Sequence, residues 1–514
     1  MPSGLLFLID LLRGGPAMIP FLILLYLIGL VCYGAWHSRR IRTQEDFAVA
    51  GRKLTAPVLV GTMLATWIGT GSLVANAERT YEIGIAMILV PLGGAFGLFI
   101  LSRVAARVRR FKQFTVQDIL ETRFGLLPRV LGTVAIITAY LTIVSYQYRA
   151  GGAVIHTMYP GLATWCEATL GSGVVNFLKD HTAWTDASWG SVIAALFIIG
   201  YTVLGGLVSV AYTDVINGAV MILGLLIGLP LLLGDAGGFE GIRETFADTP
   251  GKMELIGPIR AIMAINLILP AMLLVMGEAN LYQRFFAARS VQAAKRAAIV
   301  LVFAVLAVEM LIIVFAFVAS AVEPDLPATQ YGHVILIASM NHLPMLLAVG
   351  VLAAAVAIIV STADSFLLVS SNSVVRDVYH RFINPSAEPQ RLVTMSRATV
   401  VVLGLVAFGV SLFSDKFLAV ALWAYTMYGA SITPALLATF FWKRATGAGA
   451  AAGIAGGMVM TVGWGIVGEY DKLPEWLAQY DAVLPAMVVS VFLLIGVSLL
   501  TSPPKREQWE PFTA

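Results

Sequence analysis

The chain has 514 residues, of which 59% are hydrophobic and 12% charged, with a formal net charge of +3 and a mean hydropathy of +0.85. Soluble domains carry roughly a quarter of their residues as Asp, Glu, Lys and Arg, so this composition excludes a soluble fold and indicates an all-α membrane protein. No basic stripe suggests nucleic acid as a partner.

Apolar stretches long enough to cross a bilayer recur along the whole chain. A membrane-spanning helix needs about 20 mostly apolar residues, and about 13 stretches meet that requirement. They cover residues 19–37, 56–77, 83–102, 128–150, 190–207, 214–234, 259–283, 297–321, 343–370, 396–413, 417–441, 449–467 and 483–501. We therefore expect about 13 transmembrane helices.

Lysine and arginine are unevenly divided between the two sides that these spans define. If the N-terminus lies outside, 24 of the 33 fall in inner segments, Arg284 among them, and 7 fall in outer segments. Inner loops of membrane proteins are enriched in these residues. The sequence predicts that the N-terminus is outside and the C-terminus inside.

Two spans contain helix-weakening sequences at equivalent positions. The second span holds Gly69 and Gly71 within the segment Ala65–Ser72, and the seventh holds Pro270 followed by the segment Gly277–Asn280. Transporters built from inverted repeats often unwind two matching helices near the middle of the membrane. Glycine and serine also simply allow helices to pack closely, but two breaks five spans apart favour a pair of five-helix repeats.

The ninth span carries a cluster of oxygen-bearing side chains. Ser361, Asp364 and Ser365 share one helical face by their i, i+3, i+4 spacing, and Thr362 lies beside them. Hydroxyl and carboxylate oxygens suit a hard cation. The alternative is that each hydroxyl bonds a carbonyl of its own helix, which is less expected for a cluster that includes an acid.

Other ionisable residues within spans are functional candidates because burying charge in lipid is costly. Glu278 falls in the expected break of the seventh span, and Glu309 in the eighth span has no evident partner. Asp214 stands at the start of the sixth span. The alternative to a functional role is that its negative charge simply stabilises the N-terminus of that helix. Arg149 lies near the outer end of the fourth span. The alternative to a functional role is that its side chain extends to the membrane surface.

No segment is suited to nucleotide-driven pumping or catalysis. The chain has no Gly-rich loop followed by Lys-Ser/Thr, and no long loop that could hold a nucleotide-binding domain. No arrangement of nucleophile and base stands out either. An ion gradient is the remaining common energy source, and we do not expect an enzyme.

Short motifs in a specific order resemble those of the sodium:solute symporter family, whose members include sodium-coupled sugar, proline, sialic acid and choline transporters. They are Gly51–Leu54, Ala65–Gly69, Phe114–Asp118, Leu204–Asp214, Gln283–Arg284, Ala287–Arg289, Ser361–Ser365 and Phe441–Thr446. The resemblance implies a LeuT-like fold with inverted five-helix repeats. Residues 1–50 would then hold an extra helix and the first inner loop, 51–445 the transporter core, and 446–514 two extra helices and a cytoplasmic tail. The two repeats would cover about 51–235 and 256–445.

The resemblance also implies a main sodium site between the second and ninth spans. Its ligands would be the carbonyls of Trp67, Thr70 and Ile358 and the hydroxyls of Ser361 and Thr362. A second sodium site, present in some members, would map to Asp214, Asp364 and Ser365.

The solute would lie beside the two breaks. The candidate residues are Trp67, Tyr146, Arg149, Glu278, Asn280 and Trp423. Trp67 and Trp423 match tryptophans of the high-affinity choline transporter, and aromatic faces attract quaternary ammonium groups. Glu278 replaces another aromatic residue of that cage. The carboxylate of Glu278 could bind a cationic group of the solute, and Arg149 could bind a carboxylate. The sequence therefore favours an amine or a zwitterion as the solute.

The predicted function is sodium-coupled import of a small polar organic solute by alternating access, in the cell (inner) membrane. Proton coupling through Glu278 or Asp364, and a sensor that binds solute without transport, remain as alternatives. The expected partners are the solute, sodium ions and membrane lipid, with the chain as a monomer or homodimer.

Overall fold

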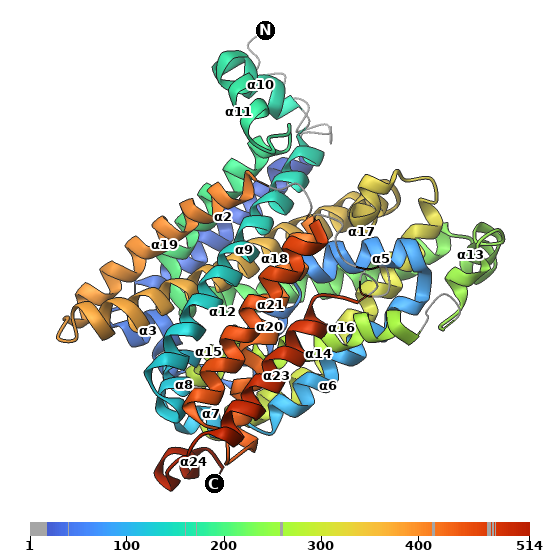
Figure 1. The fold of residues 1–514 in the computed structure, drawn as a ribbon. Coiled ribbons are helices and arrows are strands. Elements are labelled where there is room, and N and C mark those ends of the chain that lie inside the picture. Colours follow the sequence, from blue (N-terminus) through green and yellow to red (C-terminus); the bar gives the residue numbers. More distant parts are fainter. Residues whose placement is uncertain are drawn as a thin grey trace.

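The computed structural model describes residues 18–39, 41–159, 161–170, 172–256, 261–413, 417–469, 474, 477 and 480–513. In these ranges the protein is all-helical except for one isolated β-bridge between Leu54 and Ala288. The first two residues of the predicted span 259–283 lie outside the described ranges. Figure 1 shows the helices as one elongated bundle, with α10 and α11 projecting at one end and α24 at the other.

The first half of the chain contains the helices as far as Asp235. They are α2 (Met18–Ser38), α3 (Gln44–Val49), η1 (Ala50–Arg52), α4 (Ala56–Trp67), η2 (Gly71–Ala75), α5 (Asn76–Ile83), η3 (Gly84–Leu89), α6 (Val90–Ser102), α7 (Ala105–Arg110), α8 (Val116–Phe124), α9 (Leu126–Met158), α10 (Gly161–Leu170), α11 (Ser172–His181) and α12 (Ser188–Asp235).

The second half repeats the alternation of long spans and short connecting helices. It contains α13 (Gly238–Thr245), η4 (Pro250–Met253), α14 (Ala261–Gly277), α15 (Ala279–Ala287), α16 (Val291–Val322), η5 (Ala328–His333), α17 (Val334–His342), α18 (Met345–Ser373), η6 (Val374–Ile383), α19 (Pro389–Ser411), α20 (Phe417–Phe441), α21 (Gly447–Glu469), α23 (Val483–Leu500) and α24 (Arg506–Thr513).

The chain folds back on itself within α12. Gly206 has φ 49° and ψ −174°, in the left-handed region that favours glycine. The hydroxyls of Tyr201 and Thr213 are 2.5 Å apart, although twelve residues of straight helix would separate them by about 18 Å. The two arms of α12 therefore pack side by side, in agreement with the separate predicted spans 190–207 and 214–234.

Glycine also allows α6 and α14 to cross closely. A Cβ added at Gly93 would overlap the carbonyl oxygen of Ile268, and one at Gly97 would lie 2.5 Å from that of Met272. Small residues four apart are a common device for close helix contact in membranes. This crossing places the end of α14 beside α6.

The long helix α18 occupies the centre of the bundle. It packs against α4, α9, α12 and α19, and nearly every residue from Ala348 to Ser373 is buried. Its polar side chains therefore face other helices rather than lipid, which is the arrangement expected of functional polar groups in a membrane.

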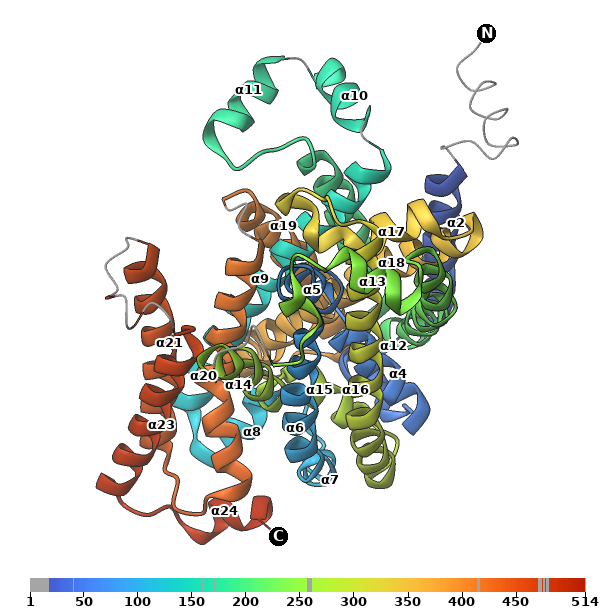
Figure 2. The same ribbon diagram turned by 90° about the vertical axis from the view of Figure 1, so that its right-hand side faces the viewer.

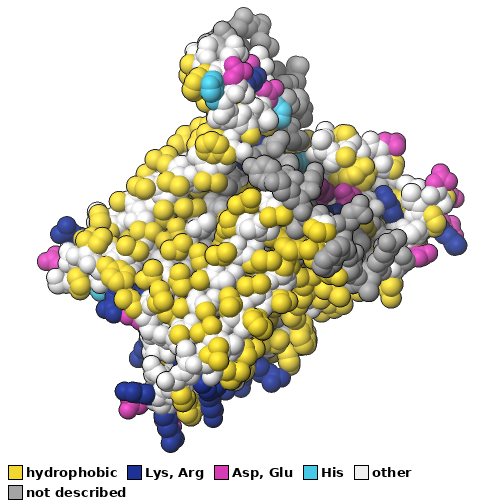
Figure 3. All heavy atoms as spheres, in the orientation of Figure 1, with side chains coloured by type: hydrophobic (Ala, Val, Ile, Leu, Met, Phe, Trp, Pro, Cys, Tyr) yellow, Lys and Arg dark blue, Asp and Glu magenta, His cyan; other side chains and the backbone are white. Residues whose placement is uncertain are grey.

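The outer surface is suited to a lipid environment. Ten helices among the described residues are long and apolar enough to cross a membrane. Large apolar side chains such as Phe303 and Phe492 are exposed on this surface. Figure 3 shows it as a broad apolar face, with lysine and arginine gathered along its lower edge.

Candidate functional site

The predicted break in the second span is confirmed. Helix α4 ends at Trp67, and Ile68 leaves the helical region with φ −76° and ψ 84°. The carbonyl of Trp67 accepts a hydrogen bond from the amide of Gly69, which closes a tight turn before the chain resumes as η2. Non-helical backbone at membrane depth is tolerated where it lines a cavity or is buried in protein.

This turn lies directly against the hydroxyl cluster of α18. A Cβ added at Gly69 would be 3.1 Å from Thr362 Oγ1. That oxygen is buried and has no hydrogen-bond partner among the described residues. Ile358, one turn earlier on α18, is fully buried. A buried hydroxyl without a partner is costly, and a cation held jointly with carbonyls of the turn would satisfy it.

Two other residues of the predicted main sodium site form side-chain hydrogen bonds within the protein. The hydroxyl of Ser361 donates to Oδ1 of Asp214, and that of Thr70 donates to Gln147. Thr70 lies next to Gly69, so its backbone, which the resemblance implies as the ligand, belongs to the same turn. The structure thus brings Trp67 and Thr70 to one side of the crossing and Ser361 and Thr362 to the other.

Asp214 belongs to a buried polar network rather than to a helix N-terminus. It lies within α12, eight residues beyond Gly206, and its Oδ2 accepts from Thr62 at 2.5 Å and from Arg284 at 3.4 Å. Arg284, which the sequence counted among the inner segments, is fully buried, and its guanidinium is held between α4, α12 and α18. The capping explanation for Asp214 is wrong.

The remaining members of the predicted second sodium site point to different partners. Ser365 accepts from Arg284 Nη2 at 2.8 Å. Asp364 Oδ1 accepts from Thr202 at 2.5 Å, and its Oδ2 is buried without a partner among the described residues. Asp214 and Ser365 are therefore linked through one guanidinium, while Asp364 faces the first arm of α12.

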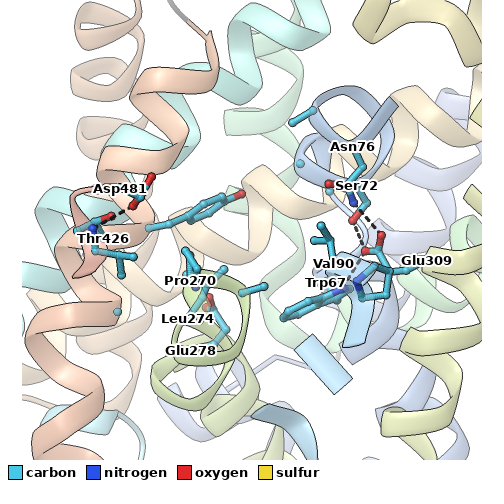
Figure 4. Close-up of a pocket in the computed structure, with 18 of the residues that line it drawn as sticks. Trp67, Ser72, Asn76, Val90, Pro270, Leu274, Glu278, Glu309, Thr426 and Asp481 are labelled. Atoms are coloured by element: carbon cyan, nitrogen blue, oxygen red, sulfur yellow. Dashed lines mark hydrogen bonds between the residues drawn. The ribbon is translucent and has the colours of Figure 1, made fainter. Parts of the chain in front are cut away.

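A cavity of about 630 Å³ opens beside the break. Its walls come from the α4 turn, η2, α5, α6, α14, α16, α18 and α20, and from the segment before α23. Polar and aromatic side chains gather on two of these walls, and they include Trp67, Ser72, Asn76, Arg79, Glu278, Glu309, Thr362, Tyr425 and Asp481. Figure 4 shows Trp67, Asn76 and Glu309 on one wall and Glu278, Leu274 and Asp481 toward the other.

Glu309 is the centre of one wall. Its carboxylate accepts from Trp67 Nε1 at 2.9 Å, from Asn76 Nδ2 at 3.0 Å and from the hydroxyl of Ser72. All three donors are neutral, and the residue is 3% exposed. Sequence reasoning flagged Glu309 as an acid within a span but did not place it in the site. The lone acid in a long apolar span was the signal that could have found it.

Glu278 forms the other acidic position, at the predicted break of the seventh span. The break is confirmed, because α14 ends at Gly277 and Glu278 has ψ 101° before α15 begins. Its Oε1 accepts from Tyr140 at 2.5 Å and from Asn280 Nδ2 at 2.9 Å, and its Oε2 accepts from Tyr428. Asn280 thus supports Glu278 from behind the cavity wall.

The other predicted solute residues lie at different distances from the cavity. Tyr146 is linked to the cavity through the lining residue Tyr425, because the hydroxyls of Tyr146 and Tyr425 are 2.6 Å apart. Arg149 Nη1 donates to the carbonyl of Ser411 at 2.7 Å and is not among the lining residues. Trp423 lies beside Gly465 of α21, also away from the lining.

Comparison with known proteins agrees with this architecture. A family model described as "Sodium:solute symporter family" matches residues 47–163 and 163–457. The sodium/proline symporter of Haemophilus influenzae is 25% identical over 516 residues, which covers 96% of each chain. High affinity choline transporter 1 of Homo sapiens is 24% identical, over 97% of this chain and 88% of the transporter.

Solved structures show the same fold at lower identity. A Na+-coupled sialic acid symporter in a substrate-bound outward-open state has a TM-score of 0.74 at 20% identity, covering 95% of this chain and 98% of that one. MhsT in complex with L-phenylalanine has a TM-score of 0.53 at 15% identity, covering 86% and 97%. The broken α4 and α14 thus occur in a transporter architecture of the LeuT-like kind.

Proposed function

The chain belongs to the sodium:solute symporter family, and on this basis we propose that it imports a small organic amine or zwitterion together with sodium by alternating access. The family consists of transporters rather than enzymes, and the protein is a multi-pass protein of the cell membrane. Sodium is its coupling ion.

For the topology we propose about 13 transmembrane helices, with the N-terminus outside and the C-terminus inside. The core would comprise residues 51–445, as repeats of about 51–235 and 256–445, with extra helices in 1–50 and 446–514. The breaks at Ile68 and Glu278 support this division because they fall at corresponding places in the two repeats.

The main sodium site is proposed at the crossing of the α4 turn and α18. The observation that carries it is the juxtaposition of Gly69 and Thr362, whose buried hydroxyl has no partner in the described part of the chain. Carbonyls of Trp67, Thr70 and Ile358 and the hydroxyls of Ser361 and Thr362 would complete the ligand set. For the second site, Asp214, Asp364 and Ser365 remain the candidates, with the free Oδ2 of Asp364 as support.

The solute is proposed to bind in the cavity between Glu278 and Glu309. Both carboxylates are buried, and the hydrogen bonds that hold them come from neutral donors. The aromatic rings of Trp67 and Tyr425 line the same space. Among the described residues that line the cavity only Arg79 is basic, and its Nη1 lies 2.8 Å from Glu82 Oε2. A cationic ammonium group with aromatic contacts complements this lining, so an amine is favoured over a zwitterion.

Trp67 offers a direct link between the two sites. Its carbonyl belongs to the turn that is proposed to hold sodium, and its indole lines the solute cavity. Sodium bound at the turn would fix the position of the indole. Coupling requires that sodium favour one conformation, and about 1–3 kcal/mol is typical of such linkage.

The sodium assignment is tested with Ser361→Ala/Thr362→Ala in proteoliposomes. We expect the sodium concentration for half-maximal uptake to rise about tenfold or more while the amount of folded protein stays similar. Ser370→Ala is the matched control, because among the described residues this buried hydroxyl of the same helix bonds only the carbonyl of Phe366. An unchanged sodium half-saturation in the double variant would refute the assignment.

Proton coupling through Glu278 or Asp364 is the second candidate, supported by the burial of both carboxylates. Uptake driven by an imposed pH gradient in the absence of sodium would favour it. Accumulation under a sodium gradient alone favours sodium and also excludes a sensor that does not transport.

A further inference from the structure

A second large cavity lies at the basic end of the bundle, the end where Arg103, Arg107, Arg110 and Lys295 gather. The solute cavity contacts the start of α6, whereas this cavity lies at its end. Its volume is about 630 Å³, and it is lined by the end of α6, by α7 and by the first turns of α16. These elements pack against one another, and Figure 2 shows α6, α7 and α16 side by side at this end of the molecule. The candidate span that includes α6 ends here at Ser102, and the span formed by α16 begins here at Val291.

The lining of this cavity is divided into a basic part and an apolar part. Arg103, Arg107, Arg110 and Lys295 lie just beyond the span or in its first turns. The apolar part lies within the spans and consists of Phe99, Ile299, Val302 and Phe303. Charge therefore gathers at the membrane boundary, and apolar surface continues from it into the hydrocarbon region.

The four cations are available for an external anion. In the part of the chain that the structure describes, Arg103, Arg107, Arg110 and Lys295 form no ion pair with a carboxylate. Arg103 stacks over the ring of Phe99 at 4.6 Å, and Arg107 donates to the carbonyl of Phe440 at 3.5 Å. Phe303 and Ile299 are exposed, at 69% and 44%.

We propose that this cavity is a binding site for an anionic glycerophospholipid. The phosphate would lie among Arg103, Arg107, Arg110 and Lys295, and the acyl chains would run along Ile299, Val302 and Phe303. Guanidinium groups bind phosphate with charge-assisted, often bidentate hydrogen bonds. Basic pockets between spans at the membrane boundary are suited to acidic headgroups, and the apolar wall distinguishes a lipid from a free phosphate.

Native mass spectrometry of the purified full-length chain measures the affinity, with phosphatidylglycerol and phosphatidylcholine as probes. We expect phosphatidylglycerol to bind more tightly. Lys295→Gln should weaken its binding about fivefold, and Arg103→Gln/Lys295→Gln about 25-fold, at about fivefold per charge near a membrane surface. Arg107 is left intact because it also holds the carbonyl of Phe440.

Arg296→Gln is the matched control, since Arg296 is the next residue of the same helix, is exposed, and does not line the cavity. It should change phosphatidylglycerol binding less than twofold. Phe303→Ala keeps all four charges and is expected to weaken binding of the lipid but not of glycerol phosphate. Equal losses in Lys295→Gln and Arg296→Gln, or equal affinity for both lipids, would overturn the proposal. So would full competition by inorganic phosphate, which would indicate an anion site without a lipid.

Discussion

The indole Nε1 of Trp67 donates a hydrogen bond to Glu309 Oε1 at 2.9 Å, which joins the turn after α4 to the middle of α16. Ser72 and Asn76 donate to the same carboxylate from η2 and α5. Glu309 thus holds both sides of the helix break in one position. It also places a negative charge on the wall of the solute cavity.

Glu309→Gln separates these two roles. The amide retains one acceptor oxygen for Trp67 but removes the charge, so binding of a cationic solute should weaken by about ten- to a hundredfold, as expected for a charged hydrogen bond. The sodium half-saturation should change much less. Uptake kinetics in proteoliposomes measure both values, with Glu240→Gln on the exposed part of α13 as the control. Equal affinity for an amine in the variant and the parent would show that the charge is not used.

Gly94→Ala tests whether the position of the Trp67 ring matters. A Cβ at this position would lie 2.8 Å from Trp67 Cζ2, so the ring must move away from α6. Overpacking of this kind costs about 1–3 kcal/mol, and we expect a loss of solute affinity of about tenfold. Gly200→Ala is the control because an added Cβ there meets nothing within 4 Å. Solute binding by isothermal calorimetry distinguishes the two, and similar affinities would contradict the prediction.

Arg129 connects three segments at the basic end of the bundle. Arg129 Nη2 lies 3.0 Å from Asp118 Oδ1 of α8, and the guanidinium also pairs with Glu121 of α8 and with Asp377 of η6. Its side chain is 5% exposed. Arg129→Gln leaves the buried carboxylate of Asp377 without its arginine partner, whereas Asp118 and Glu121 keep Arg376 and Arg381. Removing one member of a buried pair costs about 3–5 kcal/mol. We expect a clear fall in melting temperature in detergent.

The control for Arg129 is Lys179→Gln, which removes an exposed ion pair with Glu167 at 2.9 Å. Exposed pairs contribute little, so the melting temperature should not change. If both variants melted like the parent, the buried network would not stabilise the fold.

Asp481 should make solute binding depend on pH. This residue lines the cavity close to the start of α23, and burial raises the pKa of its carboxyl above the ordinary value. Because the pKa is raised, protonation on acidification begins at a higher pH than for an exposed aspartate. The negative charge is then lost, and affinity for a cation should fall as pH decreases toward the raised pKa.

Binding of an amine measured between pH 7 and pH 4 checks this expectation. Asp481→Asn should bind more weakly at pH 7 and should show a smaller decline on acidification. A decline of the same size in both proteins would assign the pH dependence to another group.

Much of the fold was predictable because it depends on local composition. A helix that crosses lipid must be apolar along its own length, so a membrane protein with many spanning helices could be predicted from the chain alone. The breaks at Ile68 and Glu278 were predictable for a similar reason, since Gly69, Gly71, Pro270 and Gly277 weaken a helix wherever it is placed. The hydroxyl cluster of the ninth span followed from helical periodicity alone.

The partners of buried polar side chains depended on how the helices cross, and only the tertiary structure decided them. Glu309 lies 242 residues from Trp67, and the burial of Arg284 beside Asp214 joins α15 to the second arm of α12. Arg149 and Trp423 lie outside the cavity lining because their faces of α9 and α20 meet other segments. The sequence determines which helices form and where they weaken, whereas contacts across the bundle depend on the rotation and depth of each helix, which packing against its neighbours sets.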